Sequence, residues 1–129
     1  MIVVDSSVWI AQLRAQGSPA AARLTDMDAT ESIVVGDLVL LEVLRGARDE
    51  RHADRLERSL RRFKVERMAD ETIAVAAARH SRLLRSRGVT IRKTIDLVIA
   101  AFCIERDYEL LHQDRDFDMI ARHTALRIA

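Results

Sequence analysis

Cysteine, aromatic residues and long apolar runs are scarce in this sequence of 129 residues. The only cysteine, Cys103, can form neither an internal disulfide nor a cysteine-rich zinc site, and this usage fits a reducing, cytoplasmic setting. Aromatic residues make up 4% of the chain, which predicts an aliphatic core. No apolar run reaches the length of a membrane span, and the first residues lack the pattern of a secretory signal. We therefore expect neither export nor membrane insertion.

Several well-known catalytic arrangements are also missing. The sequence contains no glycine-rich phosphate loop and no recognisable serine–histidine–acid arrangement. The histidines show no metal-ligand spacing, so we interpret them as surface or packed residues. They are His52, His80, His112 and His123. The chemistry of the chain must therefore be sought among its acidic and basic residues.

The charged residues are abundant and unevenly placed. Hydrophobic residues are 49% and charged residues 32% of the chain, the balance of a globular protein, and the length predicts one domain over residues 1–129. The net charge is only +1, yet arginines crowd residues 45–67 and 79–93 while several carboxylates stand alone among apolar residues. A basic rim around an acidic centre would suit a polyanion that is cut with the help of a metal.

Short apolar runs alternate with helical patterns along the chain. Strands are expected at residues 2–4, 32–35, around 65, 109–112 and 126–128. Helices are expected at residues 8–14, 19–27, 38–44, 49–63, 70–87, 94–106 and 114–123. This alternation predicts an α/β fold in which helices cover both faces of a parallel sheet. Strand-to-helix junctions then gather at one edge of the sheet.

Four isolated carboxylates lie near such junctions: Asp5, Glu42, Asp96 and Asp114. Three of them have a structural alternative, because Asp5 and Asp114 could cap helices and Asp96 could favour the positive end of a helix dipole. Glu42 is harder to explain in this way. Residues 38–44 are apolar around it, and a buried carboxylate without a partner is costly. We therefore favour a functional role for Glu42.

Carboxylates crowded at one site repel each other unless a cation neutralises them. Oxygen ligands select hard ions such as Mg²⁺ or Mn²⁺, which assist phosphodiester hydrolysis by activating water and polarising the phosphoryl oxygen. Asp116 is either an additional metal ligand or a structural residue, and Asp118 is expected to face solvent. The segment from Asp114 begins like a calcium loop, but Met119 and Ala125 stand where an EF-hand needs glycine and glutamate.

The motifs together resemble the PIN-domain family, and within it the toxins of VapBC-type toxin–antitoxin pairs. Residues 1–10 resemble the opening strand with its first aspartate and following hydroxyl residue, and residues 41–44 resemble the glutamate helix. Residues 96–101 resemble the third acidic motif, and residues 110–117 are similar to the closing strand and fourth acidic motif. The likeness spans the whole chain, and four motifs in this order are far more specific than any one of them.

The resemblance implies a three-layer α/β/α sandwich with a five-stranded parallel sheet. It also implies an endoribonuclease toxin that depends on Mg²⁺ or Mn²⁺, with catalytic or metal-ligand roles for Asp5, Glu42, Asp96 and Asp114 and a supporting hydrogen bond from Ser6. The role of Asp116 stays open, because family members differ there.

The resemblance further implies partners. Such toxins form homodimers, and a small VapB-type antitoxin holds them inactive with a tail that covers the acidic groove. The antitoxin supplies the DNA-binding half of operator control, so this chain would meet DNA only through it.

Other residues keep two interpretations. Arg92 and Lys93 precede the Asp96 helix, where they could hold RNA phosphates or remain solvated. The arginine-rich helix at 49–63 is an exposed face that could also bind RNA or the antitoxin. Trp9 is expected in the core or at a dimer contact, rather than stacked on a base.

Two other functions remain to be weighed against a nuclease. A catalytically inactive PIN-like module that binds RNA or a partner is the main alternative. Phosphoryl transfer through an aspartyl-phosphate is disfavoured, because Ser7 stands where haloacid-dehalogenase-like enzymes need a second aspartate.

Overall fold

The expected alternation of strands and helices is present in the computed structural model, which describes residues 1–27 and 32–129. The strands are β1 (Ile2–Val4), β2 (Ile33–Gly36), β3 (Lys64–Glu66), β4 (Glu109–Leu111) and β5 (Arg127–Ile128). The helices are α1 (Ser6–Leu13), α2 (Pro19–Asp26), α3 (Asp37–Arg45), α4 (Glu50–Leu60), α5 (Glu71–Ser86), α6 (Thr94–Arg106) and α7 (Arg115–His123). Each predicted element is found, with ends that differ by a few residues.

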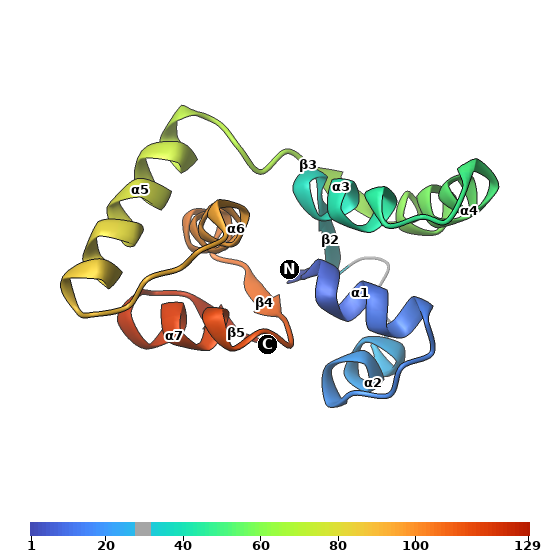
Figure 1. The fold of residues 1–129 in the computed structure, drawn as a ribbon, viewed down its shortest axis with the longest axis horizontal. Helices are drawn as coiled ribbons and strands as arrows, with labels where there is room; N and C mark the ends of the chain where they lie inside the picture. The colour runs from blue at the N-terminus through green and yellow to red at the C-terminus, as the bar shows by residue number, and fades with distance from the viewer. Residues whose placement is uncertain (28–31) are drawn as a thin grey trace.

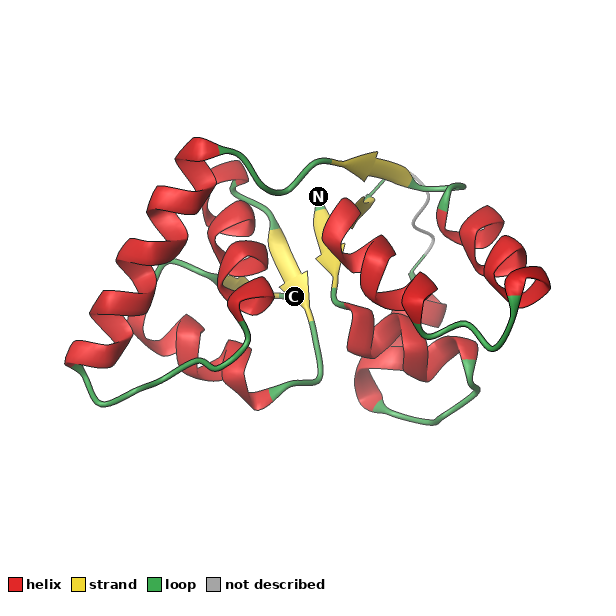
Figure 2. Ribbon diagram, turned by 45° about the horizontal axis from the view of Figure 1, so that its top comes forward, coloured by secondary structure: helices red, strands yellow, loops and turns green. Residues whose placement is uncertain are grey.

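All five strands are parallel and form one sheet in the order β3-β2-β1-β4-β5 (Figure 1). In the centre, Val3 of β1 lies opposite Val34 of β2 and Leu110 of β4. Figure 2 shows the sheet between two groups of helices, α1–α4 on one side and α5–α7 on the other. The three-layer α/β/α architecture with a five-stranded parallel sheet is thus confirmed.

The central strands are apolar along their length because both faces of the sheet are covered. Val3, Val34 and Leu110 are fully buried, as expected for β-branched and aliphatic runs without polar interruption. The edge strands differ, since Val65 of β3 is 37% exposed. Trp9 is buried and its ring centroid lies 5.2 Å from that of Phe63, so its expected place in the core is confirmed.

Close packing of Met68 against Gly36 fixes the end of β2. The side chain of Met68 lies against Gly36, in the space that a Cβ atom at position 36 would occupy. The backbone N–H of Met68 also donates a hydrogen bond of 3.0 Å to Asp37 Oδ1. These contacts hold the segment after β3 beside the start of α3, the helix that carries Glu42.

Helix α3 is covered on one side only. Val39 and Val43 are buried, whereas Leu41 is 53% exposed and Glu42 is half-buried. The expectation that Glu42 is enclosed by apolar residues is therefore met only in part. Among residues 1–27 and 32–129, none of the helices has the length and apolar character that crossing a lipid bilayer requires.

Candidate active site

The carboxyl ends of β1 and β4 lie side by side and present two aspartates. Asp5 follows β1, and its backbone N–H donates a hydrogen bond of 2.9 Å to the carbonyl of Leu111 at the end of β4. Both aspartates cap helices, because Asp5 Oδ2 accepts from the N–H of Ser7 at 3.2 Å and Asp114 Oδ1 accepts from the N–H of Asp116 at 3.0 Å. Capping leaves one further oxygen on each carboxylate, so it does not exclude a second role.

The position of Asp96 at the start of α6 fits the helix-dipole alternative, but the dipole does not account for its burial. Asp96 lies in the first turn of α6 and is 4% exposed, and its Oδ2 atom finds no hydrogen-bond partner within the described residues. The pKa of Asp96 is raised to about 7, mainly by burial and further by the negative charges of Asp5, Asp114 and Glu42, against the opposing charge of Lys93. A buried oxygen without a partner, surrounded by like charge, is destabilising unless a cation binds it.

Asp96, Asp114 and Asp116 form an acidic group that could hold a metal ion. One carboxylate oxygen from each lies within 4.8 Å of the other two, with Asp96 buried and the other two half-buried. The donor set consists only of oxygen atoms, which suits Mg²⁺ or Mn²⁺ better than softer metals. The structure thus brings Asp116, whose role the sequence left open, to the same place as Asp96 and Asp114.

Glu42 and Asp5 lie next to this group without being part of it. Burial raises the pKa of Glu42, and so does the charge of Asp5. The hydroxyl of Ser6 opposes these effects by donating a hydrogen bond of 3.2 Å to Glu42 Oε1. Because the charges of Asp5 and Glu42 also act on Asp96, the carboxylates predicted from the sequence share one electrostatic site.

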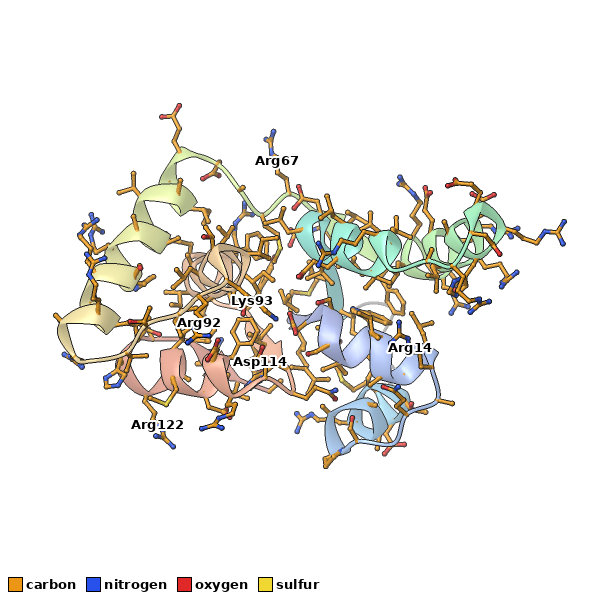
Figure 3. The ribbon with its side chains drawn as sticks, viewed as in Figure 1. Arg14, Arg67, Arg92, Lys93, Asp114 and Arg122 are labelled. Carbon is orange, nitrogen blue, oxygen red and sulfur yellow. The ribbon has the colours of Figure 1, made fainter. Side chains whose placement is uncertain are left out.

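Basic residues border the acidic site. Lys93, the residue before α6, lowers the pKa of both Asp96 and Glu42, so its ammonium group acts on two of the carboxylates at once. Arg92 is exposed. Figure 3 shows Arg92 and Lys93 on the segment that leads into α6, with Asp114 nearby at the start of α7. Two cations therefore lie where a polyanion approaching the carboxylates would meet them.

Two residues that support the site were not foreseen from the sequence. The hydroxyl of Ser7 donates to Asp5 Oδ2, and Nδ1 of His112 accepts a hydrogen bond of 3.0 Å from the N–H of Asp114. His112 was expected to be a surface or packed residue, and it is packed, with its side chain 5% exposed. The signal for Ser7 is its position two residues after Asp5. Nothing in the sequence separates His112 from the other histidines.

The sequence matches the protein family described as PIN domain over residues 2–123. Among curated proteins, it is 35% identical to Ribonuclease VapC11 of Mycobacterium tuberculosis over 131 aligned residues, which span 100% of this chain and 98% of that protein. The match therefore covers every acidic residue discussed above.

Solved structures are similar in fold over the same length. FitAcB from Neisseria gonorrhoeae aligns with a TM-score of 0.79 and 19% identity, covering 99% of this chain and 96% of that one. DNA-bound VapBC from Salmonella typhimurium aligns with a TM-score of 0.78 and 17% identity, with the same coverage. At these identities the likeness concerns the path of the chain, and it extends over the whole arrangement of sheet and helices.

Proposed function

Because the chain belongs to the PIN-domain family, we propose that it is an endoribonuclease toxin of a VapBC-type toxin–antitoxin pair, dependent on Mg²⁺ or Mn²⁺ and working in the cytoplasm. The observation that carries this proposal is the buried Asp96 oxygen that has no hydrogen-bond partner among residues 1–27 and 32–129, beside Asp114 and Asp116. Helix capping accounts for Asp5 and Asp114, but it leaves the Asp96 oxygen unexplained. A full-length curated relative named as a ribonuclease supports RNA as the substrate.

The residues present fit a hard divalent cation. Asp96, Asp114 and Asp116 would hold it, and the charges of Asp5 and Glu42 would add to its attraction. Such an ion supplies Lewis acidity, which lowers the pKa of water and polarises the phosphodiester. Binding requires Asp96 to release its proton, so metal binding and proton release are coupled at this residue.

The remaining side chains orient the site and attract the substrate. Ser6 fixes one oxygen of Glu42, and Ser7 does the same for Asp5. Lys93 and Arg92 would bind RNA phosphates at the border of the acidic site, which reduces the repulsion between the carboxylates and the polyanion. The basic residues would attract an RNA phosphate and the carboxylates would bind the cation, so the phosphate would lie next to the cation.

The proposed partners follow from family membership. We expect a homodimer and a VapB-type antitoxin that covers the acidic groove, with operator DNA contacted only through the antitoxin. Support comes from the DNA-bound VapBC structure from Salmonella typhimurium, which has a similar fold.

The proposal is tested by RNA cleavage with purified chain in Mg²⁺, in Mn²⁺ and in a chelator. The wild-type chain should cut RNA only with metal, and Asp5→Ala and Asp96→Asn should abolish cutting while the far-ultraviolet circular dichroism stays unchanged. Asp54→Asn, at an exposed position on α4, is the matched control and should cut normally. Unchanged cleavage in both site variants would contradict the proposal.

Calorimetry with Mn²⁺ separates the enzyme from an inactive binding module. A module that only binds RNA or a partner does not need the acidic group intact and should give no heat with Mn²⁺. Sequencing of RNA ends after controlled expression in cells, with Asp5→Ala as control, would then identify the RNA that is cut.

A further inference from the structure

His112 is a buried polar residue that the proposed reaction does not use. It directly follows β4, and its side chain is 5% exposed. Its ring packs against Phe117, with centroids 5.3 Å apart, and its Nδ1 atom accepts a hydrogen bond of 3.0 Å from the backbone N–H of Asp114. The imidazole therefore contacts the backbone of one acidic residue of the site.

The second ring nitrogen, Nε2, makes no hydrogen bond within the described residues. A nitrogen that accepts a hydrogen bond carries no proton, so the ring proton belongs on Nε2. Nε2 is buried and lies 3.2 Å from Oδ1 of Asp118, in the first turn of α7. Asp118 itself is 58% exposed at its side chain, so it faces solvent as expected while one oxygen approaches the ring. The ring thus lies between Asp118 and the backbone of Asp114.

The hydrogen bond from the Asp114 backbone N–H matters because the side chain of Asp114 belongs to the acidic group. Its Oδ1 atom accepts from the N–H of Asp116, and one of its oxygens lies within 4.8 Å of those of Asp96 and Asp116. Rotation of the Asp114 backbone would move this carboxylate away from both. Helix α7 alone does not prevent that rotation, since Asp114 is the residue that precedes its first turn.

We propose that His112 is a positioning residue: its Nδ1 atom holds the backbone of Asp114 so that the carboxylate meets those of Asp96 and Asp116 in a geometry that binds a divalent cation. This inference rests on the proposed function, and it assigns a role to a residue that no sequence pattern separates from the other histidines. Residues that orient metal ligands change metal affinity or activity by about 10- to 100-fold when removed.

Two substitutions separate positioning from packing. His112→Phe keeps the ring and its contact with Phe117 but leaves the Asp114 N–H without an acceptor. His112→Asn loses the ring, yet its side-chain oxygen can accept the same hydrogen bond. We expect His112→Phe to weaken Mn²⁺ binding in calorimetry by about 10- to 100-fold, with His112→Asn nearer to the wild type despite its poorer packing. A purely structural role predicts the opposite order.

Hydrogen exchange at the Asp114 amide gives a readout that needs no metal. The amide should exchange slowly in the wild-type chain, slowly in His112→Asn and faster in His112→Phe, compared at equal global stability. A rapidly exchanging Asp114 amide in the wild-type chain would overturn the inference even if His112→Phe failed to fold.

The outcomes distinguish this inference from the proposed function. Wild-type Mn²⁺ binding together with equal affinity in His112→Phe would overturn the inference alone. Absence of Mn²⁺ binding by the wild-type chain would overturn the proposed metal dependence, and the positioning role would fall with it.

Discussion

The hydroxyl of Ser6 donates a hydrogen bond of 3.2 Å to Glu42 Oε1 and so joins the first turn of α1 to the middle of α3. The two residues are 36 positions apart in the sequence, and each follows a different strand of the sheet. The bond lowers the pKa of Glu42 against the effects of burial and of the Asp5 charge. Ser6 therefore favours the ionised form of Glu42, which is the form that attracts a cation.

Ser6→Ala should weaken Mn²⁺ binding by about tenfold, because Glu42 loses the donor that orients and ionises it. The free energy of unfolding should change by about 1 kcal/mol or less, the usual net value of one hydrogen bond. Calorimetry and urea unfolding measure the two quantities. Ser6→Thr, which keeps a hydroxyl, should restore binding, and Ser86→Ala at an exposed position should have no effect. Equal Mn²⁺ affinity in Ser6→Ala and wild type would remove Ser6 from the site.

Asp96→Asn should reduce Mn²⁺ affinity by more than about 100-fold, a larger loss than for a residue that only orients a ligand. The metal-free variant should be at least as stable as the wild type, because the substitution removes a buried carboxylate whose Oδ2 has no partner in the described chain. Calorimetry and thermal unfolding in a chelator check both effects. A destabilised Asp96→Asn that still binds Mn²⁺ normally would make Asp96 a structural residue instead.

The pH dependence of stability follows from the same carboxylate. The pKa of Asp96 lies near 7 in the folded chain against an ordinary value of 3.8, so between these values the folded state holds a proton that the unfolded state releases. The free energy of unfolding of the metal-free chain should therefore fall as pH rises from about 4 to about 7 and change little above that.

Urea unfolding at pH 5 and pH 8 in a chelator measures this fall, and the raised pKa of Glu42 acts in the same direction. Asp96→Asn is the control, since it should show a smaller fall over the same interval. If the two proteins respond equally to pH, Asp96 does not have a raised pKa in solution.

Gly36→Ala tests the packing that places α3. The new methyl group would meet the side chain of Met68, which is 1% exposed and has little room to move. Overpacking of this kind costs about 1–3 kcal/mol of unfolding free energy. In combination with Met68→Ala, the added loss from Gly36→Ala should largely disappear, because the atoms that it meets are gone. Additive losses in urea unfolding of the two single variants and the double variant would contradict this arrangement.

The sequence predicts the fold more completely than the site, for physical reasons. Runs such as residues 2–4 and 33–35 have the uninterrupted β-branched pattern of strands covered on both faces, and their alternation with helices predicts a parallel sheet. The approach of Met68 to Gly36 joins segments that are distant in sequence, and no local pattern encodes it.

The acidic residues show what the sequence can and cannot predict about the site. Asp5 and Asp114 were expected either to cap helices or to belong to a site, and they cap helices within an acidic cluster, so the two interpretations do not exclude each other. The sequence could not decide the position of Asp116, because that depends on how α7 begins relative to α6. The contact from His112 to Asp114 spans only two residues, but nothing in the local sequence marks it.

Lys93 should have opposite effects on the metal and on the RNA. Its charge lowers the pKa of Asp96 and Glu42, so it also repels a cation that binds them. At pH 8, where Asp96 is largely ionised, Lys93→Gln should bind Mn²⁺ more tightly by about fivefold, since unit charges a few ångströms apart across water interact by about 1 kcal/mol. The same variant should bind RNA more weakly, with a salt dependence reduced by about 0.7 in the log–log slope if one phosphate contact is lost.

The charge of Arg92 is not among the main causes of the raised pKa of Asp96 or of Glu42. Arg92→Gln should therefore weaken RNA binding while leaving the Mn²⁺ affinity unchanged. A general loss of structure would weaken the binding of Mn²⁺ and of RNA together. Tighter Mn²⁺ binding alongside weaker RNA binding in Lys93→Gln therefore indicates an effect of the charge. Parallel losses would show that Lys93 acts through the fold.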